Sequence, residues 1–178
     1  MPLSEGWRDQ YDRMLRSRDK LIEAAGPSSI GSDEARDRLY HFFQDAFHLR
    51  DWLHNSSDPA VAAKATGLKG PGNHISATPE LALCADLCNG IKHFTLTWAV
   101  TGDIGTTIAS QSVSVTLQPI EVKAYVGGAP TQPKAPTPPA TAEHTWEITS
   151  DGQTWDAVDL ADDIIDAWDD WLRAHGLL

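Results

Sequence analysis

The stretch Ala157-Val-Asp-Leu-Ala-Asp-Asp-Ile-Ile-Asp-Ala-Trp-Asp-Asp-Trp-Leu-Arg-Ala-His175 has the clearest structural pattern in the 178-residue chain. Its apolar side chains recur every three or four residues and share one face of a helix: Leu160, Ile164, Trp168, Trp171 and Leu172. Five aspartates share the other face: Asp162, Asp163, Asp166, Asp169 and Asp170. We therefore predict an amphipathic helix over residues 157–175, packed on a core by one face and solvated on the other.

Three more helices are expected upstream, over residues 4–25, 32–55 and 79–93. The first is expected to begin at Ser4 as its N-cap and to end before Gly26-Pro27, and the second begins at Ser32. Thr78-Pro79-Glu80 combines a cap, a proline in the first turn and an acid near the positive helix end, which is typical of a helix start. Residues 56–77, rich in Ser, Gly, Ala and Pro, indicate a loop.

Between the third and the last helix the pattern changes to the alternation of strands, over residues 94–100, 112–117, 120–126 and 144–149. Ser150-Asp-Gly-Gln153 is typical of a tight turn. Residues 127–142 hold five prolines and indicate an exposed loop joining two strands. The predicted fold class is therefore α+β, mainly α: a four-helix bundle with a small antiparallel β-sheet inserted at 94–150, in a single domain over 1–178.

Composition places the chain among folded globular proteins, with 41% hydrophobic and 22% charged residues. No apolar run approaches the roughly 20 residues that span a bilayer, and the N-terminus has no secretory pattern. We expect a cytoplasmic protein that does not bind membranes. Its charge is uneven: residues 1–93 hold 11 Lys/Arg against 13 Asp/Glu, a net of −2, and residues 94–178 hold 3 against 12, a net of −9. A nucleic acid would therefore have to bind the first half.

The two cysteines, Cys84 and Cys88, lie four residues apart on the third predicted helix. They share one helix face, and no second pair exists to complete a zinc site. We expect both to be buried as small apolar side chains.

His41, Asp45 and His48 share one face of the second predicted helix. Imidazoles and carboxylates are metal ligands, but three side chains on successive turns of one straight helix seldom converge on one ion. We favour a polar or partner-facing stripe, expect no metal or other cofactor, and keep these three residues as the weaker candidate for a metal site.

Two further polar sets lie on the second and third helices: Arg50 and His54, and Asp86, Asn89 and His93. Arg50 falls at the centre of an apolar face, where a guanidinium is costly unless it is paired. We therefore expect Arg50 and His54 to meet the three residues of the third helix, with Arg18 of the first helix joining them. The favoured interpretation is a buried network that fixes helix register, and the alternative is a cleft that binds a ligand.

Cys88-Asn-Gly-Ile-Lys-His93 resembles the Arg-Asn-x-x-x-His motif of HEPN domains, helical bundles found in toxin–antitoxin, CRISPR-associated and phage-defence systems. Asn89 and His93 match the motif, and Cys88 stands at its Arg position. The resemblance covers the helices, over residues 1–93 and 155–178, and not the β insert. Active HEPN domains are metal-independent RNases whose Arg and His act at a dimer interface and leave a 2′,3′-cyclic phosphate.

Because the motif's Arg is replaced, our leading hypothesis is a non-catalytic, HEPN-like binding or assembly protein of bacterial defence, prophage or stress biology. It would be a homodimer that binds a protein partner, or a nucleotide or RNA end, and the acidic second half favours a protein partner or self-association. The enzymatic alternative is a metal-independent endoribonuclease with His93 as general acid/base, Asn89 positioning it, and Arg50 or Arg18 on the phosphate. A third alternative is a purely structural or assembly protein whose insert and Pro-rich loop make the contacts.

Overall fold

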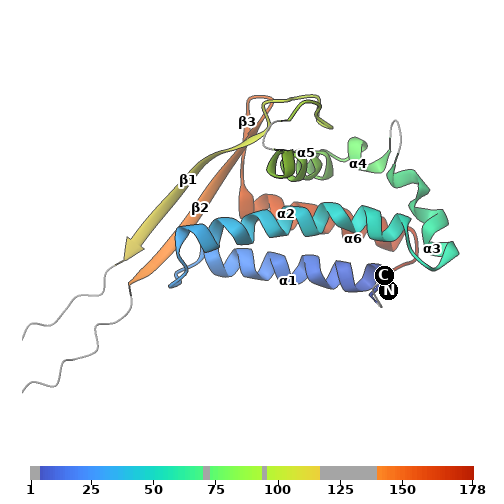
Figure 1. Cartoon of the computed structure of the whole chain (residues 1–178), viewed down its shortest axis with the longest axis horizontal. Helices are drawn as coiled ribbons and strands as arrows, with labels where there is room; N and C mark the ends of the chain where they lie inside the picture. The colour runs from blue at the N-terminus through green and yellow to red at the C-terminus, as the bar shows by residue number, and fades with distance from the viewer. Residues whose placement is uncertain (1–4, 70–72, 94–95, 117–139) are drawn as a thin grey trace, which may run out of the picture.

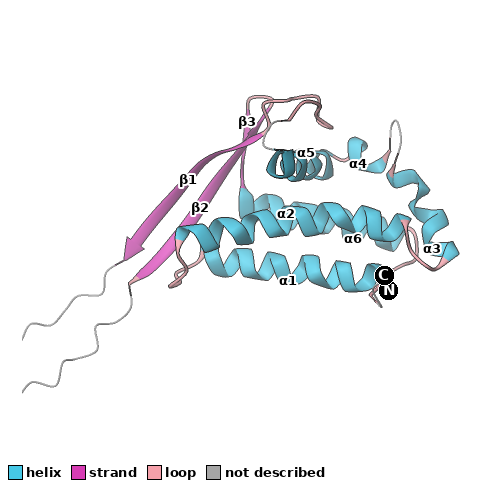
Figure 2. Ribbon diagram, in the orientation of Figure 1, coloured by secondary structure: helices cyan, strands magenta, loops and turns pink. Residues whose placement is uncertain are grey.

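The computed structural model describes residues 5–69, 73–93, 96–116 and 140–178. Its elements follow in the order α1 (Trp7–Ala25), α2 (Ser32–His54), α3 (Pro59–Lys64), the 3-10 helix η1 (Ala65–Leu68), α4 (His74–Ala77), α5 (Pro79–His93), β1 (Thr107–Thr116), β2 (Thr141–Ser150), β3 (Gln153–Asp156) and α6 (Ala157–Ala174). The strands form one antiparallel sheet of order β1-β2-β3 that precedes α6 (Figure 2). The predicted class, mainly α with a small antiparallel sheet before the last helix, is confirmed.

The long helices do not confirm the predicted four-helix bundle. Helices α1, α2 and α6 run across the view in Figure 1 and pack on one another, whereas α5 is seen nearly along its own axis. Helix α5 therefore lies crosswise over α2 and α6 and does not extend the layer that they form with α1.

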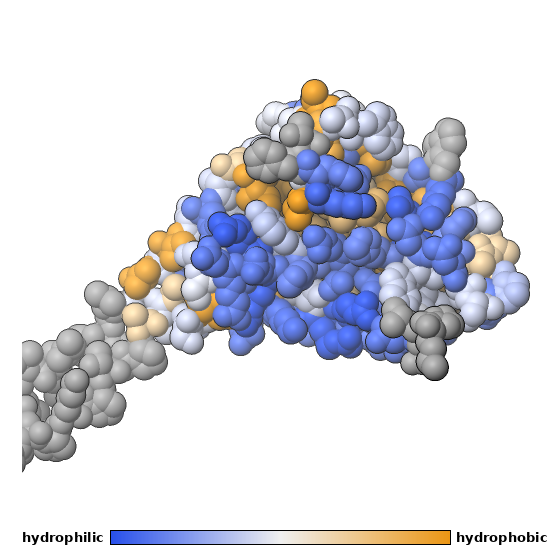
Figure 3. Space-filling view, in the orientation of Figure 1, coloured by the Kyte–Doolittle hydropathy of each residue, from blue (hydrophilic) through white to orange (hydrophobic). Residues whose placement is uncertain are grey.

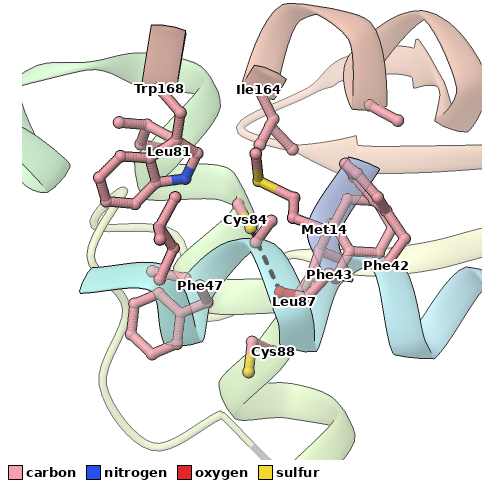
Figure 4. Packing of buried hydrophobic residues seen from close by; sticks show 14 of the residues in the cluster. Met14, Phe42, Phe43, Phe47, Leu81, Cys84, Leu87, Cys88, Ile164 and Trp168 are labelled. Carbon is pink, nitrogen blue, oxygen red and sulfur yellow. Dashed lines mark hydrogen bonds between the residues drawn. The ribbon is translucent and has the colours of Figure 1, made fainter. Parts of the chain in front are cut away.

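The core is filled by the predicted apolar faces of these helices. Phe42 and Phe43 of α2 meet in an edge-on pair with ring centroids 5.4 Å apart, and Trp168 of α6 and Met14 of α1 are fully buried nearby (Figure 4). Large apolar side chains buried in this way stabilise the fold by about 1.5–3 kcal/mol each. The core therefore joins α1, α2, α5 and α6 to one another, and the sheet contributes only part of it.

Both cysteines are buried and free, as expected. Cys84 donates a hydrogen bond from its Sγ to the backbone oxygen of Phe43, 3.5 Å away (Figure 4). Burial raises the pKa of the Cys84 thiol well above its usual value, and it raises that of Cys88 to about 11. Both side chains therefore remain protonated, unreactive thiols near neutral pH.

The helix starts predicted from the sequence agree with the structure where a capping residue marks them. Helix α5 spans the predicted 79–93, and α6 begins at the predicted Ala157 because the Asp156 carboxylate accepts the N–H groups of Val158 and Asp159, at 2.8 and 3.3 Å. Helix α1 begins at Trp7, with Gly6 as its N-cap, and the predicted cap Ser4 lies outside the described residues.

The predicted loop over residues 56–77 is wrong for most of its described part. Asp58 caps the short helix α3 by accepting the N–H of Ala60 at 2.8 Å, and η1 and α4 follow it. These short turns bury Val61, Leu68 and Ile75 in the core, so burial of a few apolar side chains decides the structure of this segment.

The sheet confirms two of the four predicted strands and corrects a third, and the fourth lies outside the described residues. Residues 112–116 lie in β1 and 144–149 in β2, but residues 96–100 form no strand, β2 begins at Thr141 inside the predicted loop, and β3 was not predicted. Residues 94–95, 117 and 120–126 and most of the Pro-rich loop lie outside the described residues. The predicted turn joins β2 to β3, with Asp151 and Gly152 at φ 48° and 71°, the left-handed conformation of a hairpin turn.

One face of β2 fixes the sheet to the helices. Trp146 and Ile148 are buried in the core, and the His144 ring, stacked on Trp146, hydrogen-bonds through Nε2 to the Ile30 carbonyl at 3.0 Å. Ser28 exchanges two backbone hydrogen bonds with Ala142, which holds the outer end of β2 against the α1–α2 connection. In Figure 1 the outer end of the β1–β2 hairpin reaches past the ends of α1 and α2.

A phenol–carboxylate hydrogen bond joins α1 to α6. The Tyr11 hydroxyl donates to Asp169 Oδ1 at 2.6 Å, and Arg173 binds the second oxygen of that carboxylate at 2.6 Å. Burial, and then the hydrogen bond to Asp169, raise the pKa of Tyr11 from 10.0 to about 12. The folded state therefore keeps this proton at pH values where the unfolded chain has lost it.

This pKa shift predicts a specific loss of stability in alkali. The contribution of Tyr11 is fully present below pH 10 and is lost as pH rises from 10 to about 12, because the unfolded chain ionises first. Denaturant unfolding across this range should show a smaller alkaline loss for Tyr11→Phe and for Asp169→Asn than for the wild type. Asp170→Asn, at an exposed aspartate of the same helix, is the control. An equal alkaline loss in all four proteins would contradict the prediction.

Candidate functional site

The structure does not place Arg50 in a buried pair between helices. Its guanidinium hydrogen-bonds to the neighbouring carboxylate of Asp51, at 3.2 Å from Nη2 to Oδ1, and lies 4.2 Å from the ring centroid of Phe47. The Arg50 side chain is 24% exposed, and Lys69 binds the same carboxylate at 2.9 Å. Arg50 therefore forms no hydrogen bond or ion pair with Asp86, Asn89 or His93, because its guanidinium binds Asp51 at the surface. The Arg50 charge lies close enough to α5 to lower the pKa of Cys88 against the effect of burial.

The remaining members of the predicted set are not assembled either. Arg18 binds Asp162 of α6 at 2.8 Å, His93 is exposed at the last residue of α5, and Asn89 and His54 are half-buried. Within the described ranges, no hydrogen bond or ion pair joins any two members of the set. Neither Arg50 nor Arg18, the two cations named for this site, is paired with His93.

The weaker metal candidate is not assembled. His41 and His48 are exposed, whereas Asp45 turns to α1, where its carboxylate accepts hydrogen bonds from Ser17 Oγ and, at 3.4 Å, from Gln10 Nε2. Among the residues that the structure describes, no group of three His, Cys, Asp or Glu side chains is placed to hold a metal ion. Asp45 instead joins α1 to α2, which explains why two polar residues of α1 are buried.

Asp86 is the one polar residue of the α5 stripe that is fully buried, and its partners lie in the loop that follows α5. Its carboxylate accepts hydrogen bonds from Val100 N–H at 2.6 Å, Thr101 N–H at 2.9 Å and the Thr101 hydroxyl at 2.6 Å. Three donors around a buried carboxylate offset the cost of removing it from water. Asp86 therefore anchors the loop over residues 96–106, which we call the α5–β1 loop.

The α5–β1 loop is held at its other end by the sheet. Asp103 accepts the N–H of Gly105 at 2.8 Å and, across the chain, the N–H of Asp151 in the β2–β3 turn at 2.6 Å. These backbone hydrogen bonds lower the pKa of the Asp103 carboxyl. Thr106 and Ser150 share a buried hydroxyl contact of 2.7 Å. The loop is thus fixed to α5 by one carboxylate and to the sheet by another.

This anchored loop forms one wall of a groove of about 560 Å³, which we call the α5–β1 groove. Every residue that lines it is uncharged, and the large side chains are Tyr40, Leu87, Ile91, Leu96, Ile104 and Ile108. Ile104 is 66% exposed, and Trp98 in the same loop is 70% exposed. Figure 3 shows hydrophobic surface gathered around α5 and this loop, above largely hydrophilic helix faces. The groove can take up apolar groups, and the polar side chains among its lining residues carry only hydroxyls.

A second groove, of about 370 Å³, lies between α6 and the α4–α5 segment and is acidic. Glu80, Asp163, Asp166 and Asp170 line it together with His74. Burial, followed by the charge of Glu80, raises the pKa of Asp163, while burial and then the charge of His175 lower the pKa of His74. This concentration of negative charge repels phosphate groups from the α6 side of the molecule.

The sequence does not predict the α5–β1 groove, because the alternating pattern of residues 94–100 favours a strand there. Trp98 and Ile104 are the signal that points to it: two large apolar residues in a segment punctuated by Gly102 and Gly105. Gly102 has φ +91°, which stops the strand pattern from continuing.

Replacing Asp86 by asparagine tests its role as the loop anchor. Asp86→Asn removes the negative charge and replaces one accepting oxygen by an NH₂ group, which is itself a donor and cannot accept the backbone N–H groups. We therefore expect the free energy of unfolding to fall by about 1–3 kcal/mol. Hydrogen exchange measured by mass spectrometry should become faster over residues 96–106, with α1 and α2 little affected. Asp166→Asn, at an exposed position of α6, is the matched control. Unchanged exchange in the loop would show that Asp86 does not anchor it.

Comparisons with protein-family models, with curated proteins and with solved structures find no match for this chain. The resemblance to HEPN domains therefore rests on Asn89 and His93 alone. No helix in the described part of the chain is long and apolar enough to cross a bilayer.

Proposed function

We propose that this protein is a non-catalytic binding and assembly protein that contacts protein partners through the α5–β1 groove and associates with itself as a homodimer. The observation that carries the proposal is the groove itself, an uncharged hollow bordered by exposed Ile104, in a loop that also exposes Trp98. Large exposed apolar side chains around a shaped depression are typical of protein contact sites.

The anchoring of the loop supports a binding role. Asp86 holds Val100 and Thr101, and Asp103 holds the loop to the β2–β3 turn, so the wall of the groove is ordered before any partner arrives. Binding to an ordered surface avoids part of the entropy cost of association. The same hydrogen bonds occupy the polar groups that would otherwise be free for chemistry.

The charge distribution supports a protein partner over RNA. Residues 94–178 carry 3 Lys/Arg against 12 Asp/Glu, a net of −9, and four carboxylates line the groove beside α6. Phosphate groups are repelled by such a surface, whereas an apolar peptide segment entering an uncharged groove is not. We therefore propose that the preferred partner is an extended or helical protein segment with apolar side chains.

The HEPN-like relationship, and with it a role in bacterial defence, prophage or stress biology, is part of this proposal through Asn89 and His93 only. An endoribonuclease would need a cation close to His93. Arg50 is bound to Asp51 and Arg18 to Asp162, which favours binding over catalysis.

A nuclease assay tests the non-catalytic part. We expect the purified protein to leave single-stranded and structured RNA intact in EDTA, even at high protein concentration, when the products are resolved by gel electrophoresis. His93→Ala should behave in the same way. RNA cleavage by the wild type that His93→Ala abolishes would contradict the proposal and establish the endoribonuclease alternative.

Peptide selection tests the groove. Peptides selected from a random display library against the immobilised protein should be rich in apolar residues. We expect Ile104→Asp to weaken their binding at least tenfold, or about 1.4 kcal/mol, because the groove would then carry a charge. Leu178→Asp, at another exposed apolar residue, is the matched control and should bind as the wild type does. Selected peptides that are mainly basic, or that bind the Ile104→Asp variant normally, would place the binding surface elsewhere.

A further inference from the structure

Strand β1 is one of the two edge strands of the described sheet. Strand β2 is paired on both sides, with β1 on one edge and with β3 and Ser28 on the other. Strand β1 pairs with β2 alone, and over the described ranges no strand lies on its second edge. The backbone N–H and C=O groups of that edge are therefore available to another strand.

The outer half of β1 also carries large apolar side chains that are substantially exposed. Residues 112–116 are all exposed, and within them Val113 and Val115 are 43% and 58% exposed. Val113 is paired with His144 and Val115 with Ala142, so both valines lie on the sheet face that is buried farther along β2. The apolar face of the sheet thus continues past the helices, along the hairpin that projects from them in Figure 1.

Strand β1 lacks the features that usually protect an edge. Its sequence, Thr107-Ile-Ala-Ser-Gln-Ser-Val-Ser-Val-Thr116, contains no charged residue and no proline, in a chain of net charge −11. Its one irregularity lies between Ile108 and Ser110, near the helices. Lysines, prolines and bulges are the devices by which natural sheets prevent edge pairing. In a strongly acidic protein this neutral strand offers a surface on which two copies can meet with little charge repulsion.

We propose that two copies of the chain pair through β1, antiparallel and edge to edge, about a two-fold axis at Ser114. This inference rests on the proposed self-association and names its surface. In this register Val113 of each copy lies opposite Val115 of the other, so that four valines form two direct cross-strand pairs. An axis at Val113 would instead set Val115 opposite Gln111 and give one valine pair. The hydrophobic pattern therefore selects the axis at Ser114.

The pairing keeps the two described helical parts away from each other. Thr107, at the helical end of β1, is seven residues from Ser114, or about 24 Å at the rise of an antiparallel strand. Because the strands run in opposite directions, the two helical parts lie at opposite ends of the joined sheet. The two β2 strands, which carry Glu143 and Glu147, are three strand spacings apart, about 14 Å, beyond the screening length of about 8 Å in physiological salt.

Light scattering coupled to size-exclusion chromatography tests the pairing over a wide range of concentrations. We expect a dimer for the wild type and a monomer for Val115→Lys, because a lysine opposite Val113 of the other copy charges the edge. Thr145→Lys adds the same charge to the exposed face of β2 and should remain a dimer. The melting temperature of monomeric Val115→Lys should match that of wild-type protein diluted to its monomer, which shows that the variant is folded.

Disulfide cross-linking tests the register. Ser114→Cys places two thiols directly opposite each other across the axis, within the Cα separation that a disulfide spans. The two copies of a cysteine at Ser112→Cys would be about 14 Å apart, too far to bridge. The native Cys84 and Cys88 are buried with raised thiol pKa values and do not compete. We expect mild oxidation to cross-link the Ser114→Cys protein and not the Ser112→Cys protein.

Each outcome has a separate meaning. A protein that is monomeric at every concentration overturns both the β1 pairing and the proposed self-association. A dimer that persists in Val115→Lys, or that cross-links at residue 112 and not at 114, overturns the β1 pairing while self-association stands. Peptide binding at the α5–β1 groove should be equal in Val115→Lys and the wild type. A result that contradicts the proposed peptide binding can therefore be told apart from one that contradicts the β1 pairing.

Discussion

The buried carboxylate of Asp86 is the interaction on which the α5–β1 loop, and with it the α5–β1 groove, depends. A fully buried charge carries a large desolvation cost that only well-placed donors can offset. All three donors come from the consecutive residues Val100 and Thr101. The carboxylate therefore receives its three hydrogen bonds only when this part of the loop adopts one backbone conformation. A helix of largely apolar residues thereby determines the course of a segment that lies outside it.

The course of the loop in turn determines where the sheet begins. Thr101 Oγ1 accepts the N–H of Asp103, and Asp103 reaches the β2–β3 turn through Asp151, so the start of β1 is fixed relative to both α5 and the sheet. The wall of the α5–β1 groove follows from this chain of contacts. The hairpin is held by it only at the start of β1, and its β2 strand is held by the Ser28–Ala142 and His144–Ile30 hydrogen bonds.

Local signals in the sequence were sufficient for the long elements. Helices α5 and α6 begin where a cap and a change of hydrophobic period coincide, at Pro79 and Ala157. The same pattern singled out Asp86, a polar residue in an apolar helix, but not its partners, because these are mostly backbone groups that any residue type offers. Arg50 was misplaced because a helical wheel gives the direction of Cα–Cβ and not the reach of a long side chain. Helix α3 has six residues, too few to show a helical period.

The described ends of the chain lie together, at the end of α1 and α6 that is remote from the projecting hairpin (Figure 1). Arg8 binds the backbone oxygen of Leu177 at 3.3 Å, which brings the start of α1 beside the residues that follow α6. Anything joined at either of these described ends therefore stands away from both the α5–β1 groove and the edge strand.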